Sequence, residues 1–125
     1  MNELLTRAQG GEAEAQNQLG IHYSEGQGLP QNYQEALRWY TKAAEADHAG
    51  AQYVLAVLYY RGKDRPQDYV LAYMWANLAA SHGDGDAINE RRDIAKVMTP
   101  SQVAVAQGLV REWKPKVGSI PDLLQ

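Results

Sequence analysis

The residues best suited to chemistry in this chain are its three histidines, because imidazole serves both as a metal ligand and as an acid or base near neutral pH. His22, His48 and His82 do not show the spacing of a ligand motif such as His-Glu-x-x-His. The chain contains no Cys, which excludes thiolate ligands and disulfides. We therefore predict no metal and no cofactor, and we assign the histidines to ordinary helix or surface roles.

Three further patterns resemble catalytic or binding motifs but lack essential parts. The segment Gly26-Gln27-Gly28 has no third glycine and no preceding strand, so a turn is favoured over a phosphate loop. Asp84 and Asp86 lack the remaining oxygen ligands of a calcium loop and are interpreted as acids at a helix start. We predict that the chain is not an enzyme, since no nucleophile motif surrounds its serines, Ser24, Ser81, Ser101 and Ser119.

Composition sets the broad class. With 125 residues, 45% hydrophobic content and a net charge of −3, the chain is expected to form one soluble domain with a real core. Its 12 Lys+Arg against 15 Asp+Glu give no electrostatic reason to expect nucleic acid. Without an apolar run of about 20 residues, no membrane insertion is predicted. The start lacks a signal peptide's apolar region, so the expected location is cytoplasmic as written, or periplasmic or secreted if a signal peptide was removed.

The chain repeats itself at an offset of 36 residues without a gap. The match includes Leu19 with Leu55 and the rare residue pair Trp39 with Trp75. A third copy fades where the equivalent of the leucines is Arg91. We place a domain at 1–114, with repeats at about 11–46 and 47–82, a partial repeat at about 83–98, a capping helix at about 99–114, and a flexible tail at 115–125.

Each repeat is predicted to contain two helices. In the first helix Ala15, Leu19 and Tyr23 recur every four residues and lie on one face. Gly26 and its equivalent Gly62 can adopt the left-handed conformation that ends this helix. A solenoid of such pairs leaves an apolar face at each end, so terminal capping helices are expected.

The second helix of each repeat begins at a marked position. Asn32 with Glu35 predicts a capping box, and Asp68 is the equivalent cap in the second repeat. Small residues then allow close approach of a neighbouring helix. They lie at Ala36 and Ala43 in the first repeat and at Ala72, Ala76 and Ala79 in the second.

Both ends of the chain carry helix signals outside the repeats. Leu4, Leu5 and Ala8 indicate a short amphipathic helix that covers the first repeat. The sequence Thr99-Pro100-Ser101-Gln102 combines a cap, a first-turn proline and a capping-box glutamine. In the proline-containing tail, we hypothesise that Leu123 and Leu124 dock on a neighbouring chain, because they are apolar residues at the end of a flexible arm.

The pattern from Ala13 to Ala44 resembles the Sel-one-like repeat, a relative of the tetratricopeptide repeat, over about residues 11–98. This resemblance implies an all-α, right-handed α/α solenoid of antiparallel helix pairs with terminal capping helices. It also implies an adaptor or scaffold that binds another protein. A disulfide-rich branch of the family is associated with binding or hydrolysis of β-lactams. That function is an alternative disfavoured by the absence of Cys, and a structural or self-assembling protein is a further alternative.

Tetratricopeptide geometry directs particular first-helix positions toward the inner, concave surface, where solenoids usually bind partners. We predict that this surface holds a peptide or a partner helix, with the protein a monomer or weak homo-oligomer. The alternative is that its aromatic residues simply pack against the preceding helix. The predicted partner-binding residues are Asn17, Ile21, Ser24, Tyr53, Val57, Tyr60 and Asn89.

Overall fold

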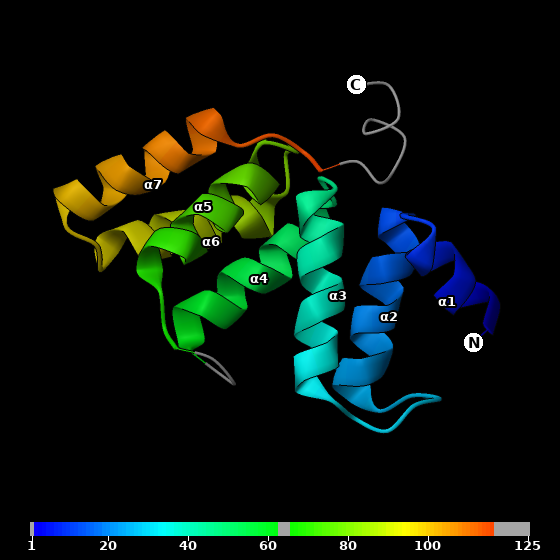
Figure 1. Ribbon diagram of the computed structural model, residues 1–125. Helices are drawn as coiled ribbons and strands as arrows, with labels where there is room; N and C mark the ends of the chain where they lie inside the picture. Colours follow the sequence, from blue (N-terminus) through cyan, green and yellow to red (C-terminus); the bar gives the residue numbers. More distant parts are fainter. Residues whose placement is uncertain (1, 63–65, 117–125) are drawn as a thin grey trace. The chain divides into compact units, whose positions relative to one another are not determined.

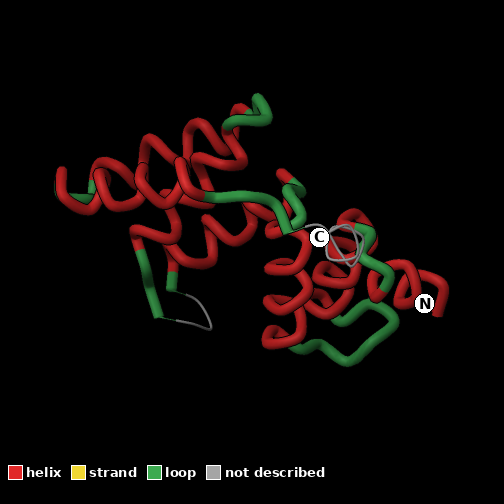
Figure 2. Tube along the Cα trace, turned by 45° about the horizontal axis from the view of Figure 1, so that its top comes forward, coloured by secondary structure: helices red, strands yellow, loops and turns green. Residues whose placement is uncertain are grey.

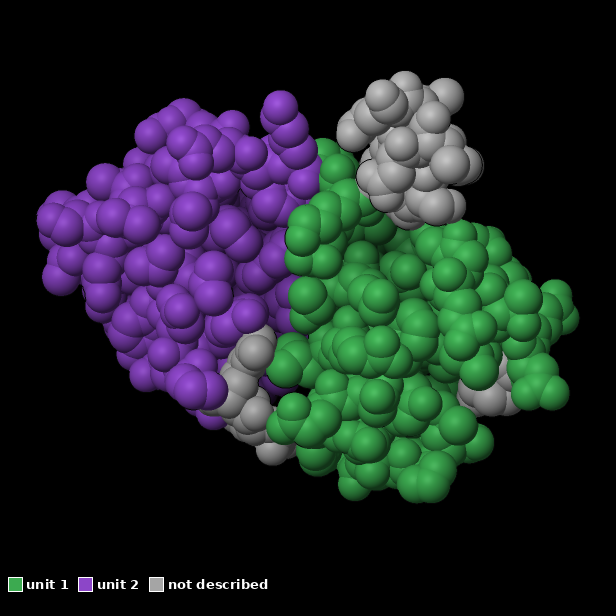
Figure 3. All heavy atoms as spheres, in the orientation of Figure 1, with its two compact units in different colours: residues 1–51, 115–125 green, residues 52–114 purple. Residues whose placement is uncertain are grey.

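The computed structural model describes residues 2–62 and 66–116, and all regular structure in these ranges is helical (Figures 1 and 2). The described part forms two compact units, residues 1–51 with 115–125 and residues 52–114, coloured separately in Figure 3. The division falls within α4, and each unit is described by itself. The helices are α1 Asn2–Gln9, α2 Ala13–Glu25, α3 Tyr33–Glu45, α4 Ala49–Arg61, α5 Tyr69–Ala80, α6 Gly85–Lys96 and α7 Pro100–Glu112.

The core of unit 1 forms where α2 packs against both α1 and α3. Leu19, only 1% exposed, lies in a cluster with Trp39. Ala8 and Ala15 complete the cluster, and the partly buried side chains around it include Leu4 and Leu5 of α1. The N-terminal helix therefore covers the first repeat as predicted, and Trp39 is a core residue.

The end of α1 has the same local structure as the end of a repeat's second helix. After α1, α3 and α5 the chain turns through left-handed residues, at Gly11, Asp47 and Gly83, with φ of 96°, 69° and 89°. At each of these residues the N–H bonds to the carbonyl three positions earlier, at 2.9–3.1 Å. Because the three positions are 36 residues apart, α1 is in register with the second half of α3.

The predicted capping box at Asn32 is only half formed. The Asn32 side chain accepts a hydrogen bond from the Glu35 N–H at 3.1 Å, which caps α3. The Asn32 N–H, however, donates to the Tyr23 carbonyl at 2.9 Å, while the Glu35 carboxylate pairs with Arg38 at 3.2 Å. The reciprocal half of the prediction is wrong because the loop brings a backbone acceptor to the donor that Glu35 was expected to serve.

The other predicted caps are confirmed. The Asp68 side chain accepts from the Leu71 N–H at 3.0 Å and begins α5. At α7 both halves of the box are present: Thr99 accepts from the Gln102 N–H at 3.1 Å, and Gln102 accepts from the Thr99 N–H at 2.9 Å.

The loop between the two helices of each repeat is closed by the same contact. Gly26 takes a left-handed φ of 73° and ends α2. The Gln31 side chain then donates to the Ser24 carbonyl at 2.9 Å, and the equivalent Gln67 donates to the Tyr60 carbonyl at 2.6 Å. One glutamine per loop thus satisfies a carbonyl that the end of the first helix leaves without an intrahelical partner.

In unit 2, α5 packs against α6 and α7. The small residues predicted to allow this approach, Ala72, Ala76 and Ala79, are all fully buried. Trp75 meets Trp113 edge to face, with ring centroids 6.3 Å apart and planes at 77°. This contact fastens the end of α7 onto α5, so the second repeat tryptophan also has a packing role.

The third repeat keeps its helix but changes its core residue. Arg91, at the position of Leu19 and Leu55, donates to the Asn77 side chain of α5 at 2.7 Å. Ile94, three residues later, is fully buried instead. The partial repeat therefore replaces a leucine contact with a hydrogen bond and shifts its buried anchor by about one turn.

Two segments fall largely outside the described residues. Asp64 and Arg65, which stand in the second loop where the first has Gly28 and Leu29, are not described. The predicted flexible tail is described only at Pro115 and Lys116; the Lys116 N–H donates to the Glu45 carbonyl at 2.6 Å. Its docking residues Leu123 and Leu124 lie outside the described ranges, so that hypothesis stays a prediction.

Candidate partner-binding face

The predicted binding residues divide between the two units. Asn17, Ile21 and Ser24 lie along α2 in unit 1. Ile21 is 37% exposed and Asn17 is half-buried. Ser24 is half-buried. On this helix, Ile21 therefore offers the apolar contact area.

The predicted residues of α4 share one half-buried face in unit 2. Tyr53, Val57 and Tyr60 recur at helical spacing, whereas Gln52 and Leu55 on the opposite side are completely buried. The fully buried positions of α4 are thus different residues from those of the half-buried face. The side chains of the half-buried face keep part of their surface in solvent.

Two of these tyrosines also have structural contacts within unit 2. Tyr53 packs against a cluster of small residues, Ala79 and Ala80 of α5 with Ala87 of α6. Tyr60 contacts Tyr69 at the start of α5, with ring centroids 5.8 Å apart. These contacts hold the rings in place without burying them, which is the state expected of preorganised binding residues.

The first turns of α6 contribute Asn89, which is exposed as a binding residue requires. Next to it lies Glu90, a half-buried carboxylate that the 36-residue alignment did not select. No hydrogen bond or ion pair reaches Glu90 from any other described residue. Repeat register alone could not identify it, because its equivalents Gln18 and Val54 carry no charge.

The electrostatics of this face are acidic. Burial raises the pKa of the Tyr53 hydroxyl, and the carboxylates of Glu90, Asp86 and Asp84 raise it further. Burial also raises the pKa of Glu90, followed by repulsion from Asp93. Both effects disfavour the charged form of the group concerned. A further negative charge near Tyr53 and Glu90 is therefore energetically unfavourable.

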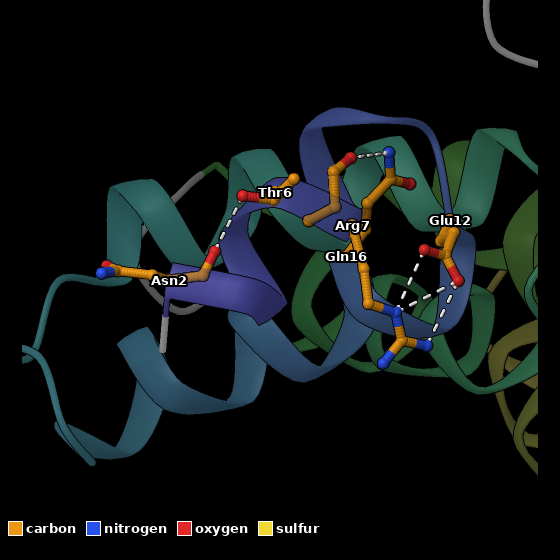
Figure 4. A network of polar contacts seen from close by, with 6 residues as sticks. Asn2, Thr6, Arg7, Glu12 and Gln16 are labelled. Atoms are coloured by element: carbon orange, nitrogen blue, oxygen red, sulfur yellow. Dashed lines mark hydrogen bonds and ion pairs between the residues drawn. The ribbon is translucent and has the colours of Figure 1, made fainter.

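The polar contacts that hold α1 in unit 1 are structural rather than part of this face (Figure 4). The Gln16 side chain donates to the Ala8 carbonyl at 3.1 Å and ties α1 to α2. The Arg7 guanidinium pairs with Glu12 at 3.0 Å across the turn between these helices. These contacts fix the N-terminal helix.

The histidines and the acidic Gly-Asp-Gly-Asp segment act at helix ends. His48 Nδ1 accepts the Ala51 N–H at 3.1 Å, which caps α4, while its Nε2 meets Glu14 at 2.7 Å. Nδ1 as acceptor places the neutral ring's proton on Nε2. Asp84 caps α6 as predicted, accepting the Asp86 N–H at 2.8 Å. Within residues 2–62 and 66–116, no group of three or more His, Asp and Glu side chains is arranged to hold a metal ion.

None of the described helices combines the length and the apolar character needed to cross a bilayer.

This geometry defines the chain as an α-helical repeat protein, in which one sequence pattern builds successive helix pairs. A family model, the Sel1 repeat, matches residues 13–48 and 49–84. These matches cover more than half of the chain, so the protein belongs to the Sel1 repeat family. Proteins of this family commonly act as protein-interaction modules, and their fold is generally a non-catalytic scaffold.

Solved structures with the same fold support this assignment. One is a protective antigen present in uropathogenic Escherichia coli strains, which displays an SLR fold, with 31% identity and a TM-score of 0.81. Another is a Sel1 repeat protein from Oxalobacter formigenes, with 39% identity and a TM-score of 0.68. The matches cover 88% and 70% of this chain but only 24% and 36% of those proteins. The prediction of an all-α solenoid of helix pairs is confirmed.

Curated proteins were also compared, and none matches this chain.

Proposed function

We propose that this protein is a non-catalytic interaction module that binds a peptide or helix of another protein. The half-buried face of α4, with Tyr53, Val57 and Tyr60, is the centre of the proposed binding surface. Asn89 of α6 belongs to the same unit, and the remaining predicted binding residues, Asn17, Ile21 and Ser24, lie on α2 in unit 1.

The observation that carries this proposal is the separation of roles on α4. Leu55 and Gln52 supply the packing that the helix requires, and both are fully buried. Tyr53 and Tyr60 each contact residues of α5 or α6 and remain partly accessible. Anchored aromatic side chains give large contact areas at low entropic cost, which explains their enrichment in protein interfaces.

A catalytic role has little support in the described residues. His48 caps a helix, and the His22 Nδ1 contacts the Gln27 carbonyl at 2.9 Å, so neither is directed at a nucleophile. The β-lactam alternative therefore has no specific observation in its favour, and a nitrocefin assay tests it directly: sustained turnover by the purified protein would establish a hydrolase.

The binding proposal is tested by affinity capture with the wild type and a Tyr53→Ala/Tyr60→Ala variant. We expect the variant to lose partners that the wild type retains. Tyr33→Ala is the matched control, because Tyr33 is exposed, begins α3 in unit 1 and is not one of the predicted binding residues. Circular dichroism confirms that each variant is folded. Equal recovery by all three proteins would favour a structural or self-assembling protein instead.

A further inference from the structure

One face of α6 presents polar and acidic residues beside Tyr53. Asp86, Asn89, Glu90 and Asp93 are spaced three, four and seven residues apart, so they follow the same side of the helix over two turns. Tyr53 packs against the cluster formed by Ala87 of this helix with Ala79 and Ala80 of α5. The carboxylates of Glu90 and Asp86 also act on its hydroxyl, which places the Tyr53 ring near the acidic residues of α6 within unit 2.

The charge of Glu90 is not neutralised inside the protein. Its carboxylate is half-buried and lacks an ion-pair partner in the described ranges. On the same helix, Arg91 donates to the Asn77 side chain at 2.7 Å and Lys96 pairs with Asp93 at 3.6 Å. Arg61 exerts a favourable field on Glu90 but forms no ion pair with it. A partly desolvated, unpaired carboxylate is costly, and a cation brought by a ligand removes that cost.

We infer that the face formed by Tyr53, Val57, Asn89 and Glu90 binds a basic segment of a partner protein, with a lysine or arginine whose charged group pairs with Glu90. We call this surface the Tyr53–Glu90 face. The inference rests on the proposed function and specifies the chemistry of the partner.

A lysine or arginine matches this face in two ways. Its aliphatic stem can lie along the Tyr53 ring and Val57, since these long side chains pack their methylene groups on apolar surface. Its charged end then reaches Glu90, where a charge-assisted hydrogen bond forms. Asn89, which is exposed, supplies a donor and an acceptor for the partner's backbone. An acidic segment would meet Glu90 and Asp86 with like charge.

The test uses two short fluorescein-labelled amphipathic peptides with the same leucine positions, one carrying lysine and the other glutamate at all remaining positions. Fluorescence anisotropy measures Kd for the full chain. We expect the lysine peptide to bind at least about tenfold tighter than the glutamate peptide, because a hydrogen bond to a charged group is worth roughly that factor or more. Added salt should weaken the lysine peptide selectively.

The decisive variant is Glu90→Gln, which removes the charge and preserves the shape. It should weaken the lysine peptide by about tenfold, with NMR shift changes at Asn89 and Val57 reduced accordingly. Glu112→Gln, at the exposed end of α7, is the matched control and should leave Kd within about twofold. Thermal melts of both variants confirm folding.

Three results would overturn the inference: equal affinity for the two peptides, an unchanged Kd in Glu90→Gln, or no binding of the lysine peptide. The proposed function fails on a different result, namely equal partner capture by the wild type and the Tyr53→Ala/Tyr60→Ala variant. If the glutamate peptide binds as tightly as the lysine peptide, the inference of a basic partner is refuted, while the proposal of an interaction module is unaffected.

Discussion

A close contact between α2 and α3 predicts that Gly20→Ala destabilises the wild type but stabilises a variant that lacks the Tyr40 ring. A Cβ atom added at Gly20 would lie 2.7 Å from two ring carbons of Tyr40, closer than van der Waals contact allows. Tyr40 is buried, so the ring has little room to retreat. In the second repeat the equivalent positions are Ala56 and Ala76. The two repeats thus fill the same site with different pairs of residues.

The magnitude follows from two opposing terms. Overpacking a core site costs about 1–3 kcal/mol, while replacing glycine by alanine within a helix contributes about 1 kcal/mol of stability. Gly20→Ala in the wild type should therefore be destabilising by up to about 2 kcal/mol. Tyr40→Ala alone should cost about 3–5 kcal/mol, as for other buried aromatics. In that background Gly20→Ala should stabilise by about 1 kcal/mol, since only the helix term remains.

Urea melts of the four proteins measure the coupling energy between the two sites. Gly85→Ala is the control for helix propensity, because Gly85 lies in α6 and an added Cβ would meet nothing within 4 Å. The reasoning is refuted if Gly20→Ala shifts the free energy of unfolding by the same amount with and without the Tyr40 ring.

The remaining predictions concern single positions, all checked in melts. Gly83→Ala should destabilise the protein by about 1 kcal/mol, because alanine is strained at a φ of 89°. An added Cβ meets nothing within 4 Å at Gly83 or at Gly85, so Gly85→Ala, which carries no such strain, should stabilise. Equal effects of the two substitutions would contradict the backbone argument. Glu90→Gln should stabilise the free protein at neutral pH by up to about 1 kcal/mol after solvent screening, because burial raises the pKa of Glu90 and so disfavours its charged form. This gain should vanish as pH falls through the raised pKa. A loss of stability at neutral pH would show that Glu90 is paired. The hydrogen bond from His48 lowers the pKa of Glu14, so ionised Glu14 should stabilise the protein above its ordinary pKa of 4.5 and lose this effect as pH falls through the lowered value. Glu14→Gln should therefore reduce the free energy of unfolding by under about 1 kcal/mol at pH 7. A reduction that persists at pH 2 would contradict the pairing.

Much of the helical architecture could be predicted because its signals are local. The spacing of Leu19 and Leu55 marked the core face, and the Thr99–Gln102 motif marked the start of α7. Helix periodicity and caps depend on residues within a few positions of each other, so a single sequence contains them. The capping box at Asn32 was predicted incorrectly in part because its backbone donor found a partner, the Tyr23 carbonyl, from the preceding helix.

The candidate site was less accessible to sequence reasoning. The repeat register selected Tyr53 and Asn89 as surface positions, and whether they bind a partner stays a prediction. Glu90 was missed because its unpaired charge depends on which residues surround it after folding, not on its place in the repeat.

By itself, the sequence determined that this protein is a series of helix pairs, where α3, α5, α6 and α7 begin, and which residues face the core in the two complete repeats, because amphipathic spacing and capping are properties of neighbouring residues. Only the tertiary structure decided that Arg91 bonds to Asn77 while Ile94 takes the buried place, that the Tyr40 ring fills the space beside Gly20, and that Glu90 is left without a partner. These outcomes arise from side chains distant in sequence competing for the same volume and the same hydrogen bonds, and that competition exists only once the helices have packed.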